Sequence, residues 1–447
     1  MFLNFKVPSN TPPATANSAE AEAEAAETLK RIREFNLKPR EIRDYLDRFV
    51  IQQDEAKKVL AVALCDHYHH VRQCLANPAL GEQDYAKQNV LLIGPTGVGK
   101  TYLVRCLAKL IGVPFVKADA TKFSETGYVG RDVDDLVRDL VRVANGQVEL
   151  AQYGIIYIDE VDKIAGRGGS GGRDVSGRGV QTNLLKLMED TEVNLHSQTD
   201  IMGQIESAMA MMQGGKGGQR TISTGHMLFI VSGAFDKLAE IIRRRLKGGQ
   251  IGFGGAGAPL ASDDAAWLRQ VGTRDLVEYG FEPEFVGRLP VRMVCDPLSV
   301  GDLESILSGS EGSILEQYKR DFHGYGIELT VTPEALQAVA RLAHLEGTGA
   351  RGLMTVFERV LRPFKFELPS TAIAKLAVDL ATVNDPQAAL TRLLQENVSG
   401  QHRVLAAEVP AFAERFQRDH GFTLEFAPPA VAALVQESLA GGKTIRA

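Results

Sequence analysis

One stretch constrains the fold of this chain more than any other. Residues 90–101 read Val-Leu-Leu-Ile-Gly-Pro-Thr-Gly-Val-Gly-Lys-Thr, so a short apolar run leads directly into the spacing G-x-x-x-x-G-K-T. The apolar run predicts a buried parallel strand, and the glycines let the next turn curl with its backbone N–H groups around a phosphate. Lys100 is expected to reach the terminal phosphates of a nucleotide, and Thr101 to offer a hydroxyl to Mg²⁺. The sequence therefore predicts a nucleoside triphosphate site between a strand and a helix.

A second apolar run ends in two carboxylates. Residues 154–160 read Gly-Ile-Ile-Tyr-Ile-Asp-Glu. In a chain with a phosphate-binding turn, this pattern places Asp159 near the Mg²⁺ ion and Glu160 where it can polarise an attacking water. The pair predicts that the nucleotide is hydrolysed as well as bound.

Strands and helices alternate along the first two thirds of the chain. Residues 114–120 and 227–235 are further apolar strand candidates, with amphipathic helical patterns between the strands. Continuously apolar strands that alternate with helices indicate an α/β fold, in which helices cover both faces of a parallel sheet. We expect the nucleotide at the carboxyl ends of its strands, and a smaller, mostly helical α+β domain after the sheet.

Composition excludes several classes of protein. The chain has 447 residues, of which 44% are hydrophobic and 24% charged, and its net charge is -6. An acidic balance argues against nucleic acid as the main partner. The sequence has neither an apolar run long enough for a membrane span nor a signal-peptide core, so we expect a cytoplasmic protein without a membrane partner.

Cysteine and histidine residues do not predict a metal centre. The four cysteines form no C-x-x-C pair, which excludes a disulfide framework and a four-cysteine zinc module. His67, His70 and Cys74 share one face of a predicted helix. That spacing is compatible with a metal site, but such side chains are far commoner on an ordinary helix surface, and we predict no zinc.

Taken together, the motifs resemble the ClpX family of AAA+ protein unfoldases over about residues 37–369. The matching blocks begin at Gly94, Ala118, Gly127, Ile158, Arg173, Ile251, Pro283 and Thr348. The resemblance implies a P-loop NTPase fold that uses ATP and Mg²⁺ in a homo-hexameric ring. It also implies that the ring acts on unfolded or tagged protein substrates, unfolds those that are folded, and feeds them to a ClpP-like peptidase.

Roles for individual residues follow from the same resemblance. Tyr128 and Val129 match a pore loop that grips substrate, and Arg288 matches an arginine finger supplied to a neighbour's ATP. Arg351 matches the sensor arginine of the small domain, and Ile251, Gly252 and Phe253 match a loop that docks on the peptidase. By the motif alone, the segment between Gly127 and Gly130 could equally be a plug of the core. The implied nucleotide-binding residues are Val50, Ile51, Pro95, Thr96, Gly97, Val98, Gly99, Lys100, Thr101, Tyr102 and Arg351.

The chain also departs from the family pattern. The family's cysteine-rich N-terminal zinc module is absent from this sequence, and no Arg-Lys-His run occurs between residues 190 and 226. Gln52 replaces a glycine that is usual in the block near the adenine. Because the Arg-Lys-His run is missing, recognition of the family's usual C-terminal degradation tag is not implied for this chain.

We predict four segments: a disordered tail over residues 1–30 that could turn helical towards Glu27, a large ATPase domain over 31–297, a small domain over 298–370 and an extension over 371–447. The sequence that begins at Arg320 recurs in a diverged form from Arg418. The extension is therefore either a partial second small domain, presenting Arg446 near a subunit contact, or a decayed repeat that caps the first copy.

Three functions fit the sequence. The first is an ATP-dependent unfoldase and translocase coupled to a peptidase. The second is a stand-alone AAA+ chaperone, which the absent N-terminal module favours. The third is an AAA+ switch that acts on nucleic acid, which the acidic balance and the Gly-Tyr-Val-Gly loop oppose.

Overall fold

A computed structural model describes residues 14–81, 85–124, 131–166, 175–195, 221–248, 264–310 and 313–441. The chain divides into two compact units, Met1–Pro297 and Leu298–Ala447. Leu298 is also the residue at which the predicted small domain begins.

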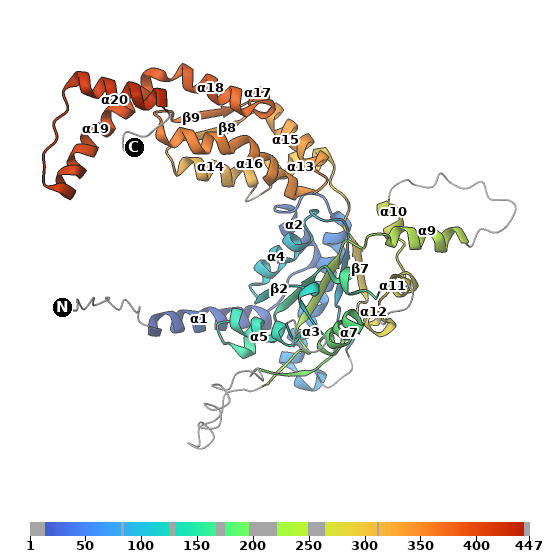
Figure 1. Cartoon of the computed structure of the whole chain (residues 1–447). Coiled ribbons are helices and arrows are strands. Elements are labelled where there is room, and N and C mark those ends of the chain that lie inside the picture. The colour runs from blue at the N-terminus through green and yellow to red at the C-terminus, as the bar shows by residue number, and fades with distance from the viewer. Residues whose placement is uncertain are drawn as a thin grey trace. The chain divides into compact units, whose positions relative to one another are not determined.

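The first unit is built around a five-stranded sheet with the order β2-β3-β6-β1-β7, and its strand pairs are all parallel. Helices lie on both sides of the strands (Figure 1). All four residues of β1 are buried, because a parallel sheet covered on both faces leaves no strand face for water. The strands are β1 (Val90–Ile93), β2 (Phe115–Asp119), β3 (Ile155–Asp159), β6 (Leu228–Gly233) and β7 (Val291–Val294), and β4 (Glu192–Asn194) with β5 (Thr221–Ser223) forms a separate antiparallel pair. The helices are α1 (Ala14–Arg33), α2 (Pro39–Asp47), α3 (Asp54–Ala76), α4 (Lys100–Ile111), α5 (Asp135–Val143), α6 (Val148–Ala151), α7 (Val175–Met188), α9 (Leu238–Gly248), α10 (Asp264–Leu268), α11 (Thr273–Tyr279) and α12 (Pro283–Gly287).

Helix α1 corrects one prediction. Residues 14–30 of the expected disordered tail are helical, and the helix continues to Arg33. Ala25, Thr28 and Ile32 are buried, and α1 contacts α3, α4 and α6. The alternating Ala and Glu residues look too polar for a core. Small alanines nevertheless let one helix face approach its neighbours closely while the glutamates stay in water.

The second unit places helices around a two-stranded parallel sheet, β8–β9. Leu329 of β8 and Leu376 and Val378 of β9 are buried beneath the helices. The strands are β8 (Glu328–Val331) and β9 (Lys375–Val378), and the helices are α13 (Val300–Ser308), α14 (Ile314–His323), α15 (Pro333–Leu345), α16 (Ala350–Glu367), α17 (Leu380–Asn384), α18 (Pro386–Glu396), α19 (Val398–His420) and α20 (Pro428–Gly441).

Strand β9 corrects the predicted end of the small domain at residue 370. Its residues pair with β8 in the register Glu328↔Lys375 to Val331↔Val378. Helices α17 and α18 then pack on α15 and α16. The small domain therefore includes β9, α17 and α18, because β8 needs β9 to satisfy its backbone hydrogen bonds.

The two copies of the repeated sequence, which begin at Arg320 and Arg418, form similar helices, but only the first copy forms a strand. Helices α14 and α15 flank β8 in the first copy, and α19 and α20 flank residues 421–427 in the second. Those seven residues form neither helix nor strand, and Phe422 is 71% exposed. Arg446 lies outside the described residues, so its suggested place near a subunit contact stays a prediction.

Candidate nucleotide and catalytic site

The turn after β1 has the backbone that its glycines predict. Gly97 and Gly99 have φ values of 81° and 96°, in the left-handed region that side chains disfavour. A Cβ on Gly94 would lie 2.6 Å from the carbonyl oxygen of Cys295, so the turn also depends on close backbone approach. Helix α4 begins at Lys100, directly after Gly99. Its free N–H groups therefore face the turn, as an anion site requires.

Lys100 and Thr101 lie at the start of α4, at the end of the turn. The Lys100 ammonium is buried and donates to the carbonyl oxygens of Gly94 and Pro95, at 2.6 and 2.9 Å. Thr101 Oγ1 lies 3.3 Å from Oδ2 of Asp159, the last residue of β3. The sequence prediction that Thr101 and Asp159 converge agrees with this distance.

Asp159 is held by a chain of hydroxyl groups. Ser232, on the neighbouring strand β6, donates to Asp159 Oδ1 at 2.7 Å. Since that bond uses the only hydroxyl proton of Ser232, the Tyr157 hydroxyl, 2.7 Å away, must be the donor to Ser232 Oγ. Burial alone would raise the pKa of Asp159, but hydrogen bonds from Ser232 and Lys117 outweigh it and lower the pKa below its ordinary value. The carboxylate therefore stays ionised, as a Mg²⁺ ligand must.

Lys117 was not a sequence-predicted site residue. It lies on β2 opposite Tyr157, and its ammonium is 3.2 Å from Asp159 Oδ2 and 3.3 Å from Thr101 Oγ1. Tyr157 and Ser232 were likewise assigned no role. Only the lateral register of β2, β3 and β6 brings these three side chains to Asp159, and a sequence read strand by strand carries no signal of that register.

Glu160 is exposed and has an unusual backbone. Its φ is 58°, a left-handed conformation that costs a residue with a side chain about 1 kcal/mol or more. The chain turns sharply here, between the end of β3 and the short 3₁₀ helix Val161–Ile164. The turn separates the two carboxylates: Asp159 faces its hydroxyl partners, whereas Glu160 faces solvent, where a water can reach it.

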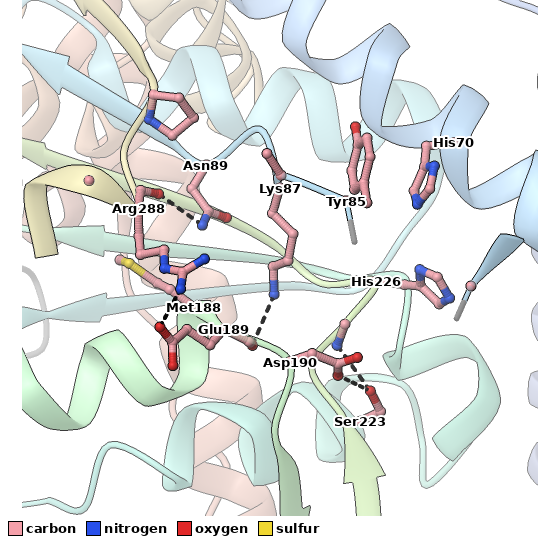
Figure 2. A pocket seen from close by; sticks show the side chains of 15 residues that line it. His70, Tyr85, Lys87, Asn89, Met188, Glu189, Asp190, Ser223, His226 and Arg288 are labelled. Carbon is pink, nitrogen blue, oxygen red and sulfur yellow. Dashed lines mark hydrogen bonds and ion pairs between the residues drawn. The ribbon is translucent and has the colours of Figure 1, made fainter. Parts of the chain in front are cut away.

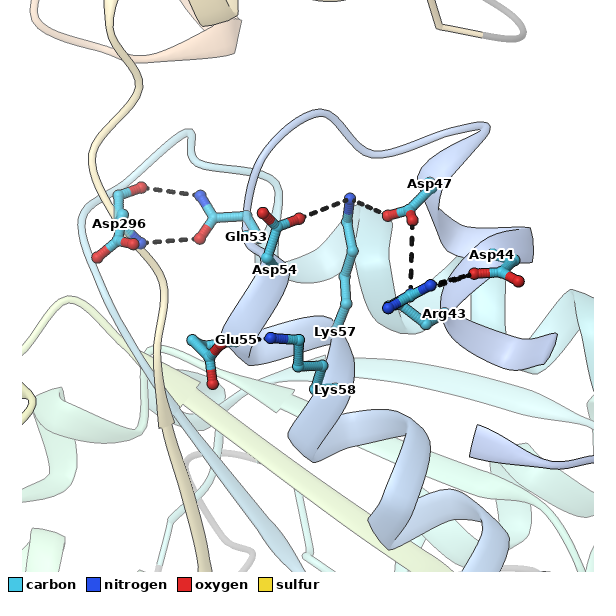
Figure 3. Close-up of polar contacts among 9 residues, drawn as sticks. All are labelled: Arg43, Asp44, Asp47, Gln53, Asp54, Glu55, Lys57, Lys58 and Asp296. Atoms are coloured by element: carbon cyan, nitrogen blue, oxygen red, sulfur yellow. Dashed lines mark hydrogen bonds and ion pairs between the residues drawn. The ribbon is translucent and has the colours of Figure 1, made fainter. Parts of the chain in front are cut away.

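The turn between α2 and α3 carries Val50 and Ile51, which are predicted to lie near the adenine. Figure 3 shows how the turn is anchored. Gln53 donates to the carbonyl oxygen of Asp296 and accepts from its N–H, both at 2.8 Å. Gln52 has a φ of 59°, which explains physically why a glycine would suit this position. On the other side of the turn, the buried Lys57 pairs with Asp47 at 2.7 Å.

Arg288 lies at the opposite end of the strands from the phosphate-binding turn. It precedes β7, and the parallel register Val90↔Val291 to Ile93↔Val294 puts the turn beyond the other end. The three residue steps from Val90 to Ile93 alone separate the two ends of β1 by about 10 Å. Arg288 is exposed and pairs with Glu189 at 2.6 Å, and its carbonyl oxygen accepts from the buried Asn89.

A cavity of about 540 Å³ adjoins Arg288 (Figure 2). His70 stacks on Tyr85 at its edge, with the ring centroids 3.5 Å apart. Lys87 donates to the carbonyl oxygens of Thr224 and Glu189, and burial lowers the pKa of Lys87 to about 8. Other lining residues are Asp190, Ser223 and His226.

His67, His70 and Cys74 do not converge as a metal site. His67 is buried with its Nε2 3.0 Å from the carbonyl oxygen of His226, whereas His70 Nε2 contacts Cys74 Sγ at 3.4 Å. Among the residues that the structure describes, no group of three or more His, Cys, Asp or Glu side chains is arranged to hold a metal ion.

Several predicted site residues cannot be placed with the others. Tyr128, Val129, Ile251, Gly252 and Phe253 lie outside the described residues. Arg351 belongs to the second unit, where it is exposed in the first turn of α16. Tyr102 lies in the first turn of α4 and is 42% exposed, whereas Val98, in the turn itself, is buried.

No helix of the described chain is both long and apolar enough to cross a membrane.

Comparison with known proteins agrees with this geometry. The family described as "AAA domain (Cdc48 subfamily)" matches residues 86–292, which include the phosphate-binding turn, Asp159, Glu160 and Arg288. That match and the parallel sheet flanked by helices confirm the predicted α/β fold and ATPase class.

Three relatives cover most of the chain, and each is an ATP-dependent Clp protease ATP-binding subunit ClpX. The protein from Borrelia duttonii (strain Ly) is 41% identical over 76% of this chain and 76% of its own length. The ClpX 3 protein of Methylococcus capsulatus is 38% identical over 83% of this chain and 86% of its own length. The ClpX protein of Azotobacter vinelandii is 37% identical over 84% of this chain and 85% of its own length. With identities of 37–41% over most of both sequences, this chain belongs to the ClpX family of AAA+ ATPases.

Proposed function

We propose that this protein is an ATP-driven unfoldase that works as a homo-hexameric ring and passes protein chains to a ClpP-like peptidase. One observation supports the assembly into a ring: the strand register separates Arg288 from the phosphate-binding turn of its own chain. An exposed arginine finger that cannot reach its own ATP needs a neighbouring copy whose ATP it can reach. The names of the three relatives support the link to the Clp protease.

The residues around the turn suit ATP hydrolysis. Lys100 and the α4 N-terminus supply positive charge for the phosphates, while Thr101 and Asp159 are the oxygen donors that Mg²⁺ prefers. Mg²⁺, when bound with ATP, would neutralise charge on the phosphates. Glu160 would orient the attacking water and accept its proton, and Arg288 of a neighbouring copy would stabilise the charge on the transferring phosphoryl group.

The pulling and docking roles extend the proposal to protein partners. Tyr128 and Val129 would grip an unfolded or tagged substrate within the ring, and Arg351 would sense the nucleotide. Ile251, Gly252 and Phe253 would contact the peptidase, since a short apolar segment among glycines suits insertion into an apolar cleft. A cytoplasmic location fits these partners.

Mixing two inactive variants tests the shared site. Glu160→Gln should bind ATP without hydrolysing it, and Arg288→Ala should leave its neighbour's site incomplete, so each variant alone should lose most ATPase activity. In mixed rings, an Arg288→Ala subunit keeps Glu160 and can receive Arg288 from a Glu160→Gln neighbour. ATPase activity should therefore reappear on mixing. Full activity of Arg288→Ala alone, or no recovery in mixed rings, would contradict the proposal.

Degradation of a folded, tagged reporter tests the peptidase partner. Phe253→Ala should keep its ATPase rate and lose ATP-dependent degradation in the presence of the peptidase. Phe422→Ala is the matched control, because it removes the same side chain from an exposed position that lies far along the chain from the proposed docking loop. Equal degradation by wild type and Phe253→Ala would remove the docking assignment.

A further inference from the structure

Lys117 places a positive charge where the nucleotide site needs a metal ion. Its ammonium lies 3.2 Å from Asp159 Oδ2 and 3.3 Å from Thr101 Oγ1. Thr101 and Asp159 are the two residues proposed above to hold Mg²⁺. A lysine ammonium is a compact cation with three donors, so it can replace part of a metal ion's charge at such a pair.

The strand register makes this contact part of the fold. Lys117 pairs with Tyr157 across β2 and β3, and Asp159 follows Tyr157 by two residues on the same strand. The lysine side chain extends along the strands to the carboxylate and passes near the Tyr157 ring, with Nζ 5.9 Å from the ring centroid. Its side chain is 37% exposed and that of Asp159 is 18% exposed, so the ammonium has solvent into which it can move.

We propose that Lys117 is an internal counter-ion that occupies the Mg²⁺ position when no nucleotide is bound and yields it when Mg²⁺ arrives with ATP or ADP. In the nucleotide-free protein, Lys117 opposes metal binding by charge repulsion and by holding Asp159. When nucleotide binds without metal, the same ammonium partly compensates the phosphate charge. Lys117 therefore makes nucleotide affinity less dependent on Mg²⁺ than Thr101 and Asp159 alone would make it.

The experiment compares nucleotide affinity with and without metal. A fluorescent ADP analogue is titrated into the full-length protein in Mg²⁺ and in EDTA, and the ratio of the two affinities is the readout. Lys117→Met should weaken binding in EDTA and strengthen it in Mg²⁺, which raises the ratio by about fivefold to tenfold for a partly exposed charge. Lys117→Arg, which keeps the charge, should stay near the wild-type ratio, and the exposed Lys122→Met is the control for loss of a nearby lysine.

A second readout needs no nucleotide. Mn²⁺ binding followed by electron paramagnetic resonance should be about fivefold tighter in Lys117→Met than in wild type. An unchanged affinity ratio in Lys117→Met, a parallel loss in both conditions, or tight Mn²⁺ binding by nucleotide-free wild type would each overturn the proposal. The last outcome requires no variant to fold.

This inference rests on the proposed roles of Lys100, Thr101 and Asp159. Lys100→Ala distinguishes a failure of the site assignment from a failure of the Lys117 proposal, because it should weaken nucleotide binding in Mg²⁺ and in EDTA alike. If Lys100→Ala binds nucleotide normally, the site assignment itself fails. If Lys100→Ala loses binding and Lys117→Met behaves as wild type, only the role of Lys117 fails.

Discussion

Removing the Ser232 hydroxyl should destabilise the first unit by about 2–3 kcal/mol. Ser232 is fully buried and donates to the Asp159 carboxylate at 2.7 Å, and a hydrogen bond to a charged group contributes about 1.5–3 kcal/mol. The Tyr157 hydroxyl would lose its acceptor at the same time. Ser232→Ala therefore leaves the buried Tyr157 hydroxyl and the partly buried Asp159 carboxylate less well satisfied, while it removes a single oxygen atom.

Unfolding by urea, followed by the fluorescence of Trp267, measures this cost. Trp267 is the only tryptophan of the chain and lies in α10 of the first unit, so its signal reports on that unit. Ser223→Ala is the matched control. Ser223 donates to Asp190 at 2.8 Å, the same chemistry in a more exposed place, and its loss should cost about 1 kcal/mol or less.

The pH dependence gives a further check on the reasoning. The folded pKa of Asp159 is lowered, so its stabilising contribution is fully present above the unfolded pKa of about 3.9 and is lost only as the pH falls through the folded pKa. The difference between wild type and Ser232→Ala should therefore be the same at pH 6 and pH 8. A cost no larger than that of Ser223→Ala would refute the assigned hydrogen-bond chain.

Three further predictions concern other parts of the first unit. Gly94→Ala should abolish nucleotide binding in the fluorescent ADP titration, because its Cβ would clash with Cys295. Asn89→Ala should lower the ATPase rate about tenfold with ADP affinity unchanged, because Asn89 holds the backbone of Arg288; a normal rate would contradict this role. Burial lowers the pKa of His67 from 6.5 to about 3, so only the unfolded imidazole gains a proton as the pH falls below 6.5. The unfolding free energy should drop by up to about 1.4 kcal/mol per pH unit below 6.5, and His67→Gln should flatten that slope.

The sequence predicted the elements that local pattern determines. The strand before Gly94 and the two carboxylates after Tyr157 are contiguous motifs, and the described site brings Thr101 and Asp159 together as expected. Lys117 and Ser232 were missed because their roles depend on which strands lie side by side. Strand order is a property of long-range packing, which no single segment encodes.

The errors at the two ends of the chain have a related cause. More than half of the residues of α1 are alanine or glutamate, a composition that predicts a tail, yet one face with Ala25 and Ile32 is enough to bury the helix. The predicted small domain ends at residue 370 because the resemblance to the family extends only to about residue 369. Strand β9 has only four residues, too few to stand out by periodicity.

The pairing of β9 with β8 has a practical consequence for anyone who expresses parts of this protein. A fragment cut after Ser370 would keep α13 to α16 but expose the backbone edge of β8, with Leu329 uncovered beside it. Such an edge is a template for intermolecular pairing, and the fragment should precipitate or associate. A fragment that continues through α18, to Glu396, keeps the sheet closed on that side and is the shorter piece to attempt in crystallisation or NMR.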